Sequence, residues 1–130
     1  MNEMMKTMAA SASGMAAQAA RLRLSTENIA NADTPGYHRK TVSFEETFDR
    51  TRDTRAVATG PVELDRAELA RVYDPNNPLA GPDGYYDGSN VNMIVEIADA
   101  REANRSYEAN LKMFDQARQM ASSLLDLLRR

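Results

Sequence analysis

The side chains that most resemble a ligand-binding set lie in a glycine-rich run near the middle of the chain. The run Asp83-Gly84-Tyr85-Tyr86-Asp87-Gly88 suggests a calcium loop, because carboxylates beside glycines supply oxygen ligands in such loops. The twelfth position counted from Asp83 is Ile94, where an EF-hand requires a glutamate. We therefore interpret the run as turn chemistry and expect no bound metal.

The other residues that catalysis commonly uses are isolated in the sequence. His38 is the one histidine and lies beside two basic residues, which predicts a surface contact rather than a general base. The acidic pair Glu45-Glu46 is more typical of a solvated face than of an acid/base dyad. The chain lacks cysteine, and it has neither a glycine-rich phosphate loop nor a G-x-S-x-G elbow. The sequence therefore predicts a protein that is not an enzyme and uses no cofactor.

The charge balance argues against a nucleic-acid-binding protein. The chain has 16 Lys+Arg and 19 Asp+Glu, a formal net charge of -3, whereas nucleic-acid binders carry basic patches that offset phosphate charge. No run approaches the length of about 18 apolar residues that a transmembrane helix needs. The first residues also lack the pattern of a secretory signal. We expect a single domain that does not span a membrane and has no cleaved signal peptide.

Proline and glycine divide the chain into three parts. All five prolines lie between Pro35 and Pro82, and five of the six glycines lie between Gly36 and Gly88. Because these residues interrupt helices, we expect helices on either side of them. The predicted fold is mainly α, with two long terminal helices that form a coiled coil within and between subunits. We predict an N-terminal helix over residues 1–32, a turn-rich, partly extended middle over 33–89, and a C-terminal helix over 90–130.

The N-terminal segment carries a heptad pattern that begins at Met1. Large apolar residues recur every seven positions, as on the seam of a coiled coil. So few large side chains do not offset the conformational entropy of a helix this long, and we expect weak order until a partner helix binds. The alternative is an amphipathic helix that lies on its own domain. The predicted assembly seam of this helix comprises Met5, Met8, Met15, Leu22 and Ile29.

The C-terminal segment has a stronger stripe of apolar residues at alternating spacings of four and three. Asn104 and Arg118 interrupt the stripe, and they either fix the register between helices or lie at its edge in contact with water. Asn92 is one of several candidate N-caps. A helix this long cannot bury itself in so small a chain, so we expect it to contact another chain. Its predicted assembly seam comprises Met93, Ile97, Tyr107, Leu111, Phe114, Leu125 and Leu128.

The middle segment begins with a clear turn and is harder to interpret beyond it. Thr34-Pro35-Gly36-Tyr37 predicts a type II turn that ends the first helix. Phe44 and Phe48, four residues apart, suggest a helical turn packed on the terminal helices. We expect a loop over residues 49–60, either strand or helix over 62–72, and a loop or extended linker over 74–88.

Two stretches resemble the bacterial flagellar axial proteins, which make rod and hook. The first is Leu24–Tyr37, in which an Asn-x-x-Asn helix end at Asn28 and Asn31 runs into the Thr-Pro-Gly-Tyr turn. The second is the helix Val91–Leu128. The linker over residues 74–80 narrows the resemblance to the short proximal members of the flagellar basal-body rod protein family. The resemblance implies that a set of family residues shapes the helix exit and directs the middle segment outward. These residues are Asn28, Asn31, Thr34, Pro35, Gly36 and Tyr37.

The resemblance also implies a structural role in the bacterial flagellum. The expected protein is a subunit of the proximal rod, which polymerises helically into a hollow drive shaft that transmits torque and surrounds the export channel. Its expected partners are copies of itself, other proximal and distal rod proteins, and proteins of the base (MS) ring and the export-gate junction. The flagellar type III export apparatus would carry it into the periplasm. The alternatives are a sibling proximal rod protein, a non-flagellar helical adaptor or secretion chaperone, and a small enzyme that uses carboxylates.

Overall fold

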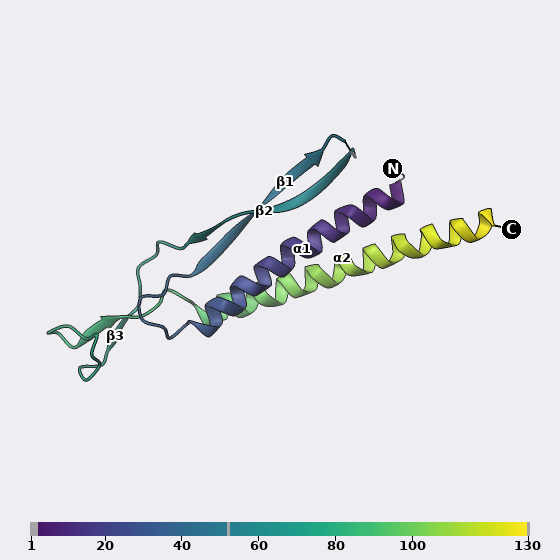
Figure 1. Ribbon diagram of the computed structural model, residues 1–130. Coiled ribbons are helices and arrows are strands. Elements are labelled where there is room, and N and C mark those ends of the chain that lie inside the picture. Colours follow the sequence, from purple (N-terminus) through teal and green to yellow (C-terminus); the bar gives the residue numbers. More distant parts are fainter. Residues whose placement is uncertain (1–2, 52, 130) are drawn as a thin grey trace.

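The computed structural model describes residues 3–51 and 53–129 of this chain. Met1, where the heptad pattern begins, and the last residue of the predicted C-terminal segment lie outside the described residues. The described residues form two helices at the chain ends and four strands between them. Figure 1 shows how these elements are arranged. In chain order the elements are α1 (Glu3–Ala30), β1 (Lys40–Asp49), β2 (Thr54–Leu64), β3 (Arg71–Tyr73), β4 (Tyr85–Asp87) and α2 (Met93–Leu128).

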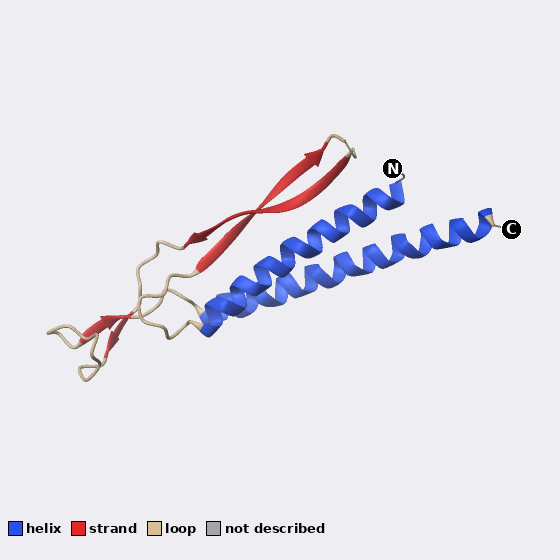
Figure 2. Ribbon diagram, in the orientation of Figure 1, coloured by secondary structure: helices blue, strands red, loops and turns tan. Residues whose placement is uncertain are grey.

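The two helices run antiparallel and pack side by side along most of α1 (Figure 2). With 36 residues, α2 extends about 54 Å. Asn92 is its N-cap, because its side chain accepts hydrogen bonds from the N–H groups of Ile94 and Val95. The prediction of two terminal helices is therefore confirmed, whereas a coiled coil between subunits stays a prediction.

Small and polar residues allow the close approach of α1 and α2. A Cβ added at Gly14 would lie 2.9 Å from the side-chain nitrogen of Asn110, so the helix backbone is tightly packed there. The buried apolar residues of the helices are few and mostly small, and they are Ala17, Leu24, Ala103 and Ala117. Most large apolar side chains of α2 are consequently exposed to solvent.

Strands β1 and β2 form a long antiparallel hairpin, which overturns two predictions. Residues 54–60, expected within a loop, lie in β2, and Phe44 and Phe48 lie on β1 instead of in a helical turn. Lys40 pairs with Leu64 at one end of the hairpin, and Asp49 pairs with Thr54 at the other.

The pairing of the hairpin shifts at one position. Val42 pairs with Val62 and Phe44 pairs with Thr59, so Ser43 alone lies opposite two residues, Gly60 and Pro61. This irregularity is a β-bulge, which accommodates a proline within a strand because a bulged residue does not donate a ladder hydrogen bond.

A small lobe follows the hairpin. β3 pairs with β4 in antiparallel orientation, and the rings of Tyr73 and Tyr85 lie 5.1 Å apart between centroids. Within residues 62–72, for which strand and helix were both open, 62–64 end β2 and 71–72 begin β3, whereas 65–70 lie in neither a strand nor a helix. The linker over residues 74–88 is largely turn and loop, as expected, with β4 near its end.

These elements give an elongated molecule with distinct sides. The hairpin lies along α1, and α1 separates it from α2 (Figure 1). The lobe projects beyond the end at which α1 leads into the hairpin, whereas the chain termini lie at the opposite end. No helix in the described ranges is both long and apolar enough to cross a membrane.

Candidate functional site

Asn28, one of the residues predicted to shape the helix exit, holds the exit of α1 against the start of β1. Its side-chain nitrogen donates to the carbonyl of Lys40 at 2.9 Å, and its oxygen accepts from the Lys40 N–H at 2.9 Å. The Tyr37 hydroxyl also donates to the Asn28 oxygen, at 2.7 Å. Asn28 is buried, so these bonds form away from water. The side chain thus ties two segments of the chain to the last turns of α1.

Tyr37 is shielded by the same packing. Burial raises the pKa of its phenol above the ordinary value of 10.0, and the nearby charge of Glu27 adds to that rise. The neighbouring Lys40 partly opposes it. The Tyr37 phenol is therefore held in its neutral, hydrogen-bond-donating form.

The remaining residues predicted to shape the helix exit build the turn itself. The Tyr37 N–H donates to the Thr34 carbonyl at 3.2 Å, and Gly36 has a φ of 75°, which is the predicted type II turn. Pro35 occupies the position whose φ proline presets. Thr34 also donates from its hydroxyl to the Asn31 side-chain oxygen at 3.0 Å, while the Asn31 side-chain nitrogen donates to the Glu27 carbonyl at 2.9 Å.

The turn also contacts the segment that leads into α2. The Gly36 N–H lies 3.0 Å from the Gly88 carbonyl, and the Asn90 N–H donates to the Tyr37 carbonyl at 3.3 Å. The Ser89 hydroxyl donates to the Ala32 carbonyl. After this junction the chain doubles back, so the hairpin lies along α1, and it is the lobe that projects beyond the helices.

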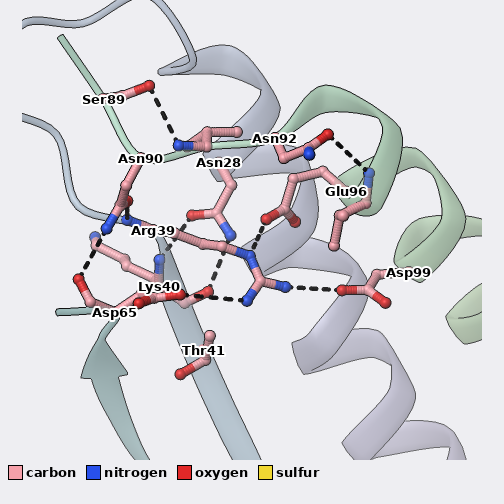
Figure 3. A network of polar contacts seen from close by, with 12 residues as sticks. Asn28, Arg39, Lys40, Thr41, Asp65, Ser89, Asn90, Asn92, Glu96 and Asp99 are labelled. Carbon is pink, nitrogen blue, oxygen red and sulfur yellow. Dashed lines mark hydrogen bonds and ion pairs between the residues drawn. The ribbon is translucent and has the colours of Figure 1, made fainter. Parts of the chain in front are cut away.

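An ion-pair network beside the turn was not predicted from the sequence. Arg39 pairs with the fully buried Glu96 and, at 2.8 Å, with Asp99, both on the first turns of α2 (Figure 3). Arg21 of α1 reaches Asp99 at 3.2 Å. Burial by itself would lower the pKa of Arg39, but the hydrogen bond and charge of Glu96, with the charges of Asp99 and Asp65, raise it overall. The network therefore joins the start of the hairpin to both helices.

The network went unpredicted because its members are far apart in the sequence. Each charged side chain is ordinary for an exposed helix face or a loop when only local spacing is considered. Arg39 and Glu96 are 57 residues apart, and their pairing depends on the fold that brings the helix exit to the start of α2. The position of Glu96 in the first turn of α2 is the one local signal, since acidic residues stabilise helix N-termini.

The predicted seam residues of α1 lie beside the helix–helix contact rather than in its centre. Met5 is exposed, whereas the other four, Met8, Met15, Leu22 and Ile29, are half-buried. The most buried positions of α1 are instead Ser11, Ala17, Leu24, Ser25 and Asn28.

The predicted seam residues of α2 are more exposed still. Phe114 is half-buried, and the exposed members are Met93, Ile97, Tyr107, Leu111, Leu125 and Leu128. Arg118 is also exposed and pairs weakly with Asp115, which places it at the edge of the stripe.

The structure brings one residue of each predicted seam, Leu22 and Tyr107, to a shared groove. Leu22 and Thr26 of α1 and Asn104 and Tyr107 of α2 line an open, mostly apolar groove, together with Ala19, Arg23, Glu27 and Ala30. The predicted seam residues Met8, Met15 and Ile29 of α1 do not line this groove. The groove leaves apolar side chains of both helices open to a further helix.

The residues that the sequence suggested for metal binding or catalysis make structural contacts instead. Asp83 accepts from the Tyr85 N–H at 3.1 Å and pairs with Arg71 at 2.8 Å, as a turn residue does. His38 Nδ1 lies 3.0 Å from the Asp65 carbonyl oxygen. Among residues 3–51 and 53–129, no group of three or more histidine, aspartate or glutamate side chains could hold a metal ion.

Comparison with known proteins places these features in a family. Residues 8–38 match the family model described as flagella basal body rod protein, and residues 83–127 match the C-terminal model of the flagellar basal body rod FlgEFG proteins. A flagellar basal-body rod protein FlgC of Agrobacterium fabrum is 44% identical over 124 residues, which cover 90% of this chain and 89% of that protein. This chain belongs to the FlgC family of flagellar basal-body rod proteins. The predicted family is thereby confirmed. Among its short proximal members the linker over residues 74–80 predicts rod protein C rather than its sibling, rod protein B, and the similarity to FlgC agrees with that prediction.

More distant FlgC proteins align over nearly the same span. FlgC of Salmonella typhimurium is 33% identical over 88% of this chain and 90% of its own length. FlgC of Bacillus subtilis is 29% identical over 90% of this chain and 93% of its own length. The first family model ends just past the Thr-Pro-Gly-Tyr turn, and the second covers most of α2. The hairpin between them lies within the span shared with the FlgC relatives.

Proposed function

We propose that this chain is a structural subunit of the proximal rod of the bacterial flagellum. It polymerises helically into a hollow shaft that transmits torque and surrounds the export channel. It does so as a building element and not as an enzyme. The observation that carries the proposal is the similarity to FlgC over nine tenths of both chains.

The exposed apolar residues of the helices support polymerisation. Leu22 and Tyr107 meet at a groove that no other part of the described chain covers, and both were predicted from the sequence as seam residues. Burial of apolar area contributes about 25 cal/mol per Å², so each neighbour that fills the groove adds stability. In the assembled shaft, the predicted seams of α1 and α2 pack against helices of neighbouring subunits.

The turn and the ion-pair network supply stiffness in this proposal. Asn28 and Arg39 lie where the hairpin, the lobe segment and both helices converge. Buried hydrogen bonds and ion pairs with fixed partners hold one geometry. Torque applied to the helices is thereby passed to the hairpin and lobe instead of being lost in a flexible joint.

The proposed partners and location follow from the rod assignment. The chain contacts copies of itself, other proximal and distal rod proteins, the base (MS) ring and the export-gate junction. The flagellar type III apparatus exports it, and it resides in the rod where the rod crosses the periplasm. It neither binds nucleic acid nor spans a membrane.

Electron cryotomography of cells that lack this gene tests the proposal. We expect base rings and export gates without a projecting rod, and restored rods when the gene is supplied on a plasmid. Complementation with the gene also excludes an effect on neighbouring genes. An intact rod in the deleted cells would refute the assignment and favour the helical adaptor.

A further inference from the structure

We propose that the lobe formed by β3 and β4 binds the outer face of the first turns of α2 on a second copy of this chain, which is displaced along the long axis of the molecule. The inference rests on the proposed function, since it identifies a contact between neighbouring rod subunits. It concerns surfaces other than the groove between α1 and α2.

One face of the β3–β4 ladder carries two exposed tyrosines and a free carboxylate. Arg71 pairs with Asp87 across the ladder. Two residues further along, Tyr73 pairs with Tyr85. Because side chains alternate along a strand, all four lie on the same face, which we call the tyrosine face. Tyr73 is 63% exposed, and the exposed Asp87 carboxylate has no hydrogen bond or ion pair with any residue that the structure describes.

Each ring of the tyrosine face is held against the lobe. A Cβ added at Gly84 would lie 2.7 Å from the Cε2 atom of Tyr73, so this ring packs directly on the glycine backbone. The Arg71 guanidinium lies 5.5 Å from the centroid of the Tyr85 ring and pairs with Asp83 at 2.8 Å. Rings that are already fixed lose little conformational entropy when a partner binds.

The contact of Arg71 with Tyr85 shows which chemical group suits this face. A guanidinium group stacks on aromatic rings and pairs with carboxylates, and Arg71 does both within the lobe. Tyr73 and Asp87, which are diagonal neighbours in the ladder, offer the same combination to a guanidinium from outside. Residues 71–88 contain three aspartates and one arginine, so the charge of the lobe also favours a basic partner.

The outer face of α2 carries a basic surface on its first turns. A shallow hollow there is lined by Ile94, Ile97, Ala98, Arg101, Glu102 and Arg105. Ile94 is 80% exposed, although it is large and apolar. Glu102 pairs with Arg21 of α1, whereas Arg101 and Arg105 form no ion pair within the described ranges. The hollow therefore offers two free guanidinium groups beside an exposed isoleucine.

This combination does not continue along the helix. The positions that follow Arg105 on the same face, at spacings of three and four, are charged or polar, and they are Glu108, Lys112, Asp115 and Gln119. They carry both signs of charge and no large apolar side chain. The complement of the tyrosine face is therefore confined to the first turns of α2.

The lobe does not reach this surface in its own chain. Neither β3 nor β4 contacts α2 within the part of the chain that the structure describes. The lobe projects beyond the end of the molecule at which α2 begins (Figure 1). A second copy that lies alongside, displaced in the direction of the lobe, places its first turns of α2 against the tyrosine face. Because the two surfaces differ, each copy binds one neighbour with its lobe and another with α2, and the contact adds copies in a staggered series.

Photo-cross-linking in assembled basal bodies tests the contact. The photoreactive amino acid p-benzoylphenylalanine replaces Tyr73 in cells that carry no other copy of the gene, and isolated basal bodies are irradiated. We expect a covalent adduct of two copies of the chain, with the second attachment point within residues 93–105 by mass spectrometry. The matched control is the same replacement of Tyr86, which pairs with Val72 on the opposite face of the ladder and should not join α2.

The outcomes separate this inference from the proposed function. An adduct to a different protein, or to another segment of the chain, overturns the inference and leaves the rod assignment intact. The same holds if basal bodies contain the variant chain but no adduct, or if the Tyr86 position gives an equal adduct to α2. If basal bodies of native cells lack the chain, the rod assignment fails and this inference fails with it.

A charge exchange keeps the inference testable if the photoreactive variant does not assemble. In chains without the probe, Arg101→Glu/Arg105→Glu places carboxylates opposite the tyrosine face. We expect the fraction of chemically cross-linked dimers in basal bodies to fall about two- to five-fold, as for loss of an exposed ion pair, and the added change Asp87→Arg to restore part of it.

The matched control for the charge exchange is Lys112→Glu/Arg129→Glu. It makes the same change of charge at exposed positions further along α2, and it should leave the cross-linked fraction unchanged. No loss in Arg101→Glu/Arg105→Glu, or an equal loss in the two double variants, contradicts the assigned surface.

Discussion

At the scale of single residues, Asn28 occupies a position whose hydrogen bonds require both the oxygen and the N–H of a side-chain amide. It is buried, and its side-chain amide satisfies both backbone groups of Lys40 as a neighbouring strand would. The amide oxygen also accepts from Tyr37. Aspartate is the nearest isostere, but it lacks the N–H that donates to the Lys40 carbonyl. This requirement gives a physical reason for an asparagine at position 28.

Replacement of Asn28 by alanine tests that role. We expect Asn28→Ala to lower the free energy of unfolding by about 2–4 kcal/mol, since three hydrogen bonds are lost and buried backbone groups of Lys40 are left without partners. Urea unfolding followed by circular dichroism measures the change. The matched control is Asn104→Ala on the exposed face of α2, with an expected change within about 0.5 kcal/mol. Equal effects of the two changes would show that the junction adds no stability.

A second prediction at this scale concerns the pKa of the Tyr37 phenol. Its pKa is raised above 10.0 by burial and by Glu27, so only its neutral form is stabilised by the fold. The contribution is complete below the pKa of the unfolded chain and is lost as pH rises through the higher pKa of the folded chain. Ultraviolet titration of the native chain minus that of Tyr37→Phe isolates this phenol. We expect a midpoint above 10.0, and a midpoint at or below it would contradict the burial.

At the scale of elements, the helices and the turn were predictable because their signals are local. The stripe of α2 and the absence of proline and glycine from it predict a helix without reference to the rest of the chain. Thr34-Pro35-Gly36-Tyr37 likewise contains the residues that a type II turn requires. The pattern did not reveal which residues the helices bury against each other, since small residues such as Gly14 and Ala103 form that contact.

The hairpin was not predictable because its signals conflict. Phe44 and Phe48 are four apart, which suggests a helix, although residues four apart also share one face of a strand. Gly60 and Pro61 indicate a loop, but they lie within β2 at the bulge. The strands alternate weakly because much of the hairpin is exposed, so burial imposes little pattern on them.

The exposed stripe of α2 is the basis of a prediction about assembly. We expect Leu111→Asp and Phe114→Asp to abolish motility, because a carboxylate would enter the proposed seam. Leu111 is exposed in the single chain, so Leu111→Asp should change the free energy of unfolding by less than about 1 kcal/mol. Swimming in soft agar and helix content of the purified variants are measured together. Met113→Asp, also exposed on α2, is the control for an added charge. Normal motility in both seam variants would show that Leu111 and Phe114 do not lie in the assembly seam.

At the scale of the whole molecule, the polar anchors are concentrated at one end. Asn28, Arg39, Ser89 and Asn90 join the helices, hairpin and lobe segment where the chain turns. Near the termini, the exposed ion pair of Lys6 and Asp53 links α1 to the hairpin. Exposed ion pairs contribute little. We therefore expect the isolated chain to be locally stable at the junction and to open readily at the tips of its helices.

This asymmetry predicts a gradient of amide hydrogen exchange. In the isolated chain we expect slow exchange at residues 24–31 and 94–103, and fast exchange at residues 3–12 and 121–129, because opening free energies follow local burial. In isolated basal bodies the protection should extend to the helix tips, since neighbouring subunits then cover the apolar stripes. Mass spectrometry of peptides from both samples measures the gradient. Uniformly slow exchange along α1 in the isolated chain would mean that the helix is already fully stabilised before assembly. The ordering of α1 would then not be coupled to assembly of the rod.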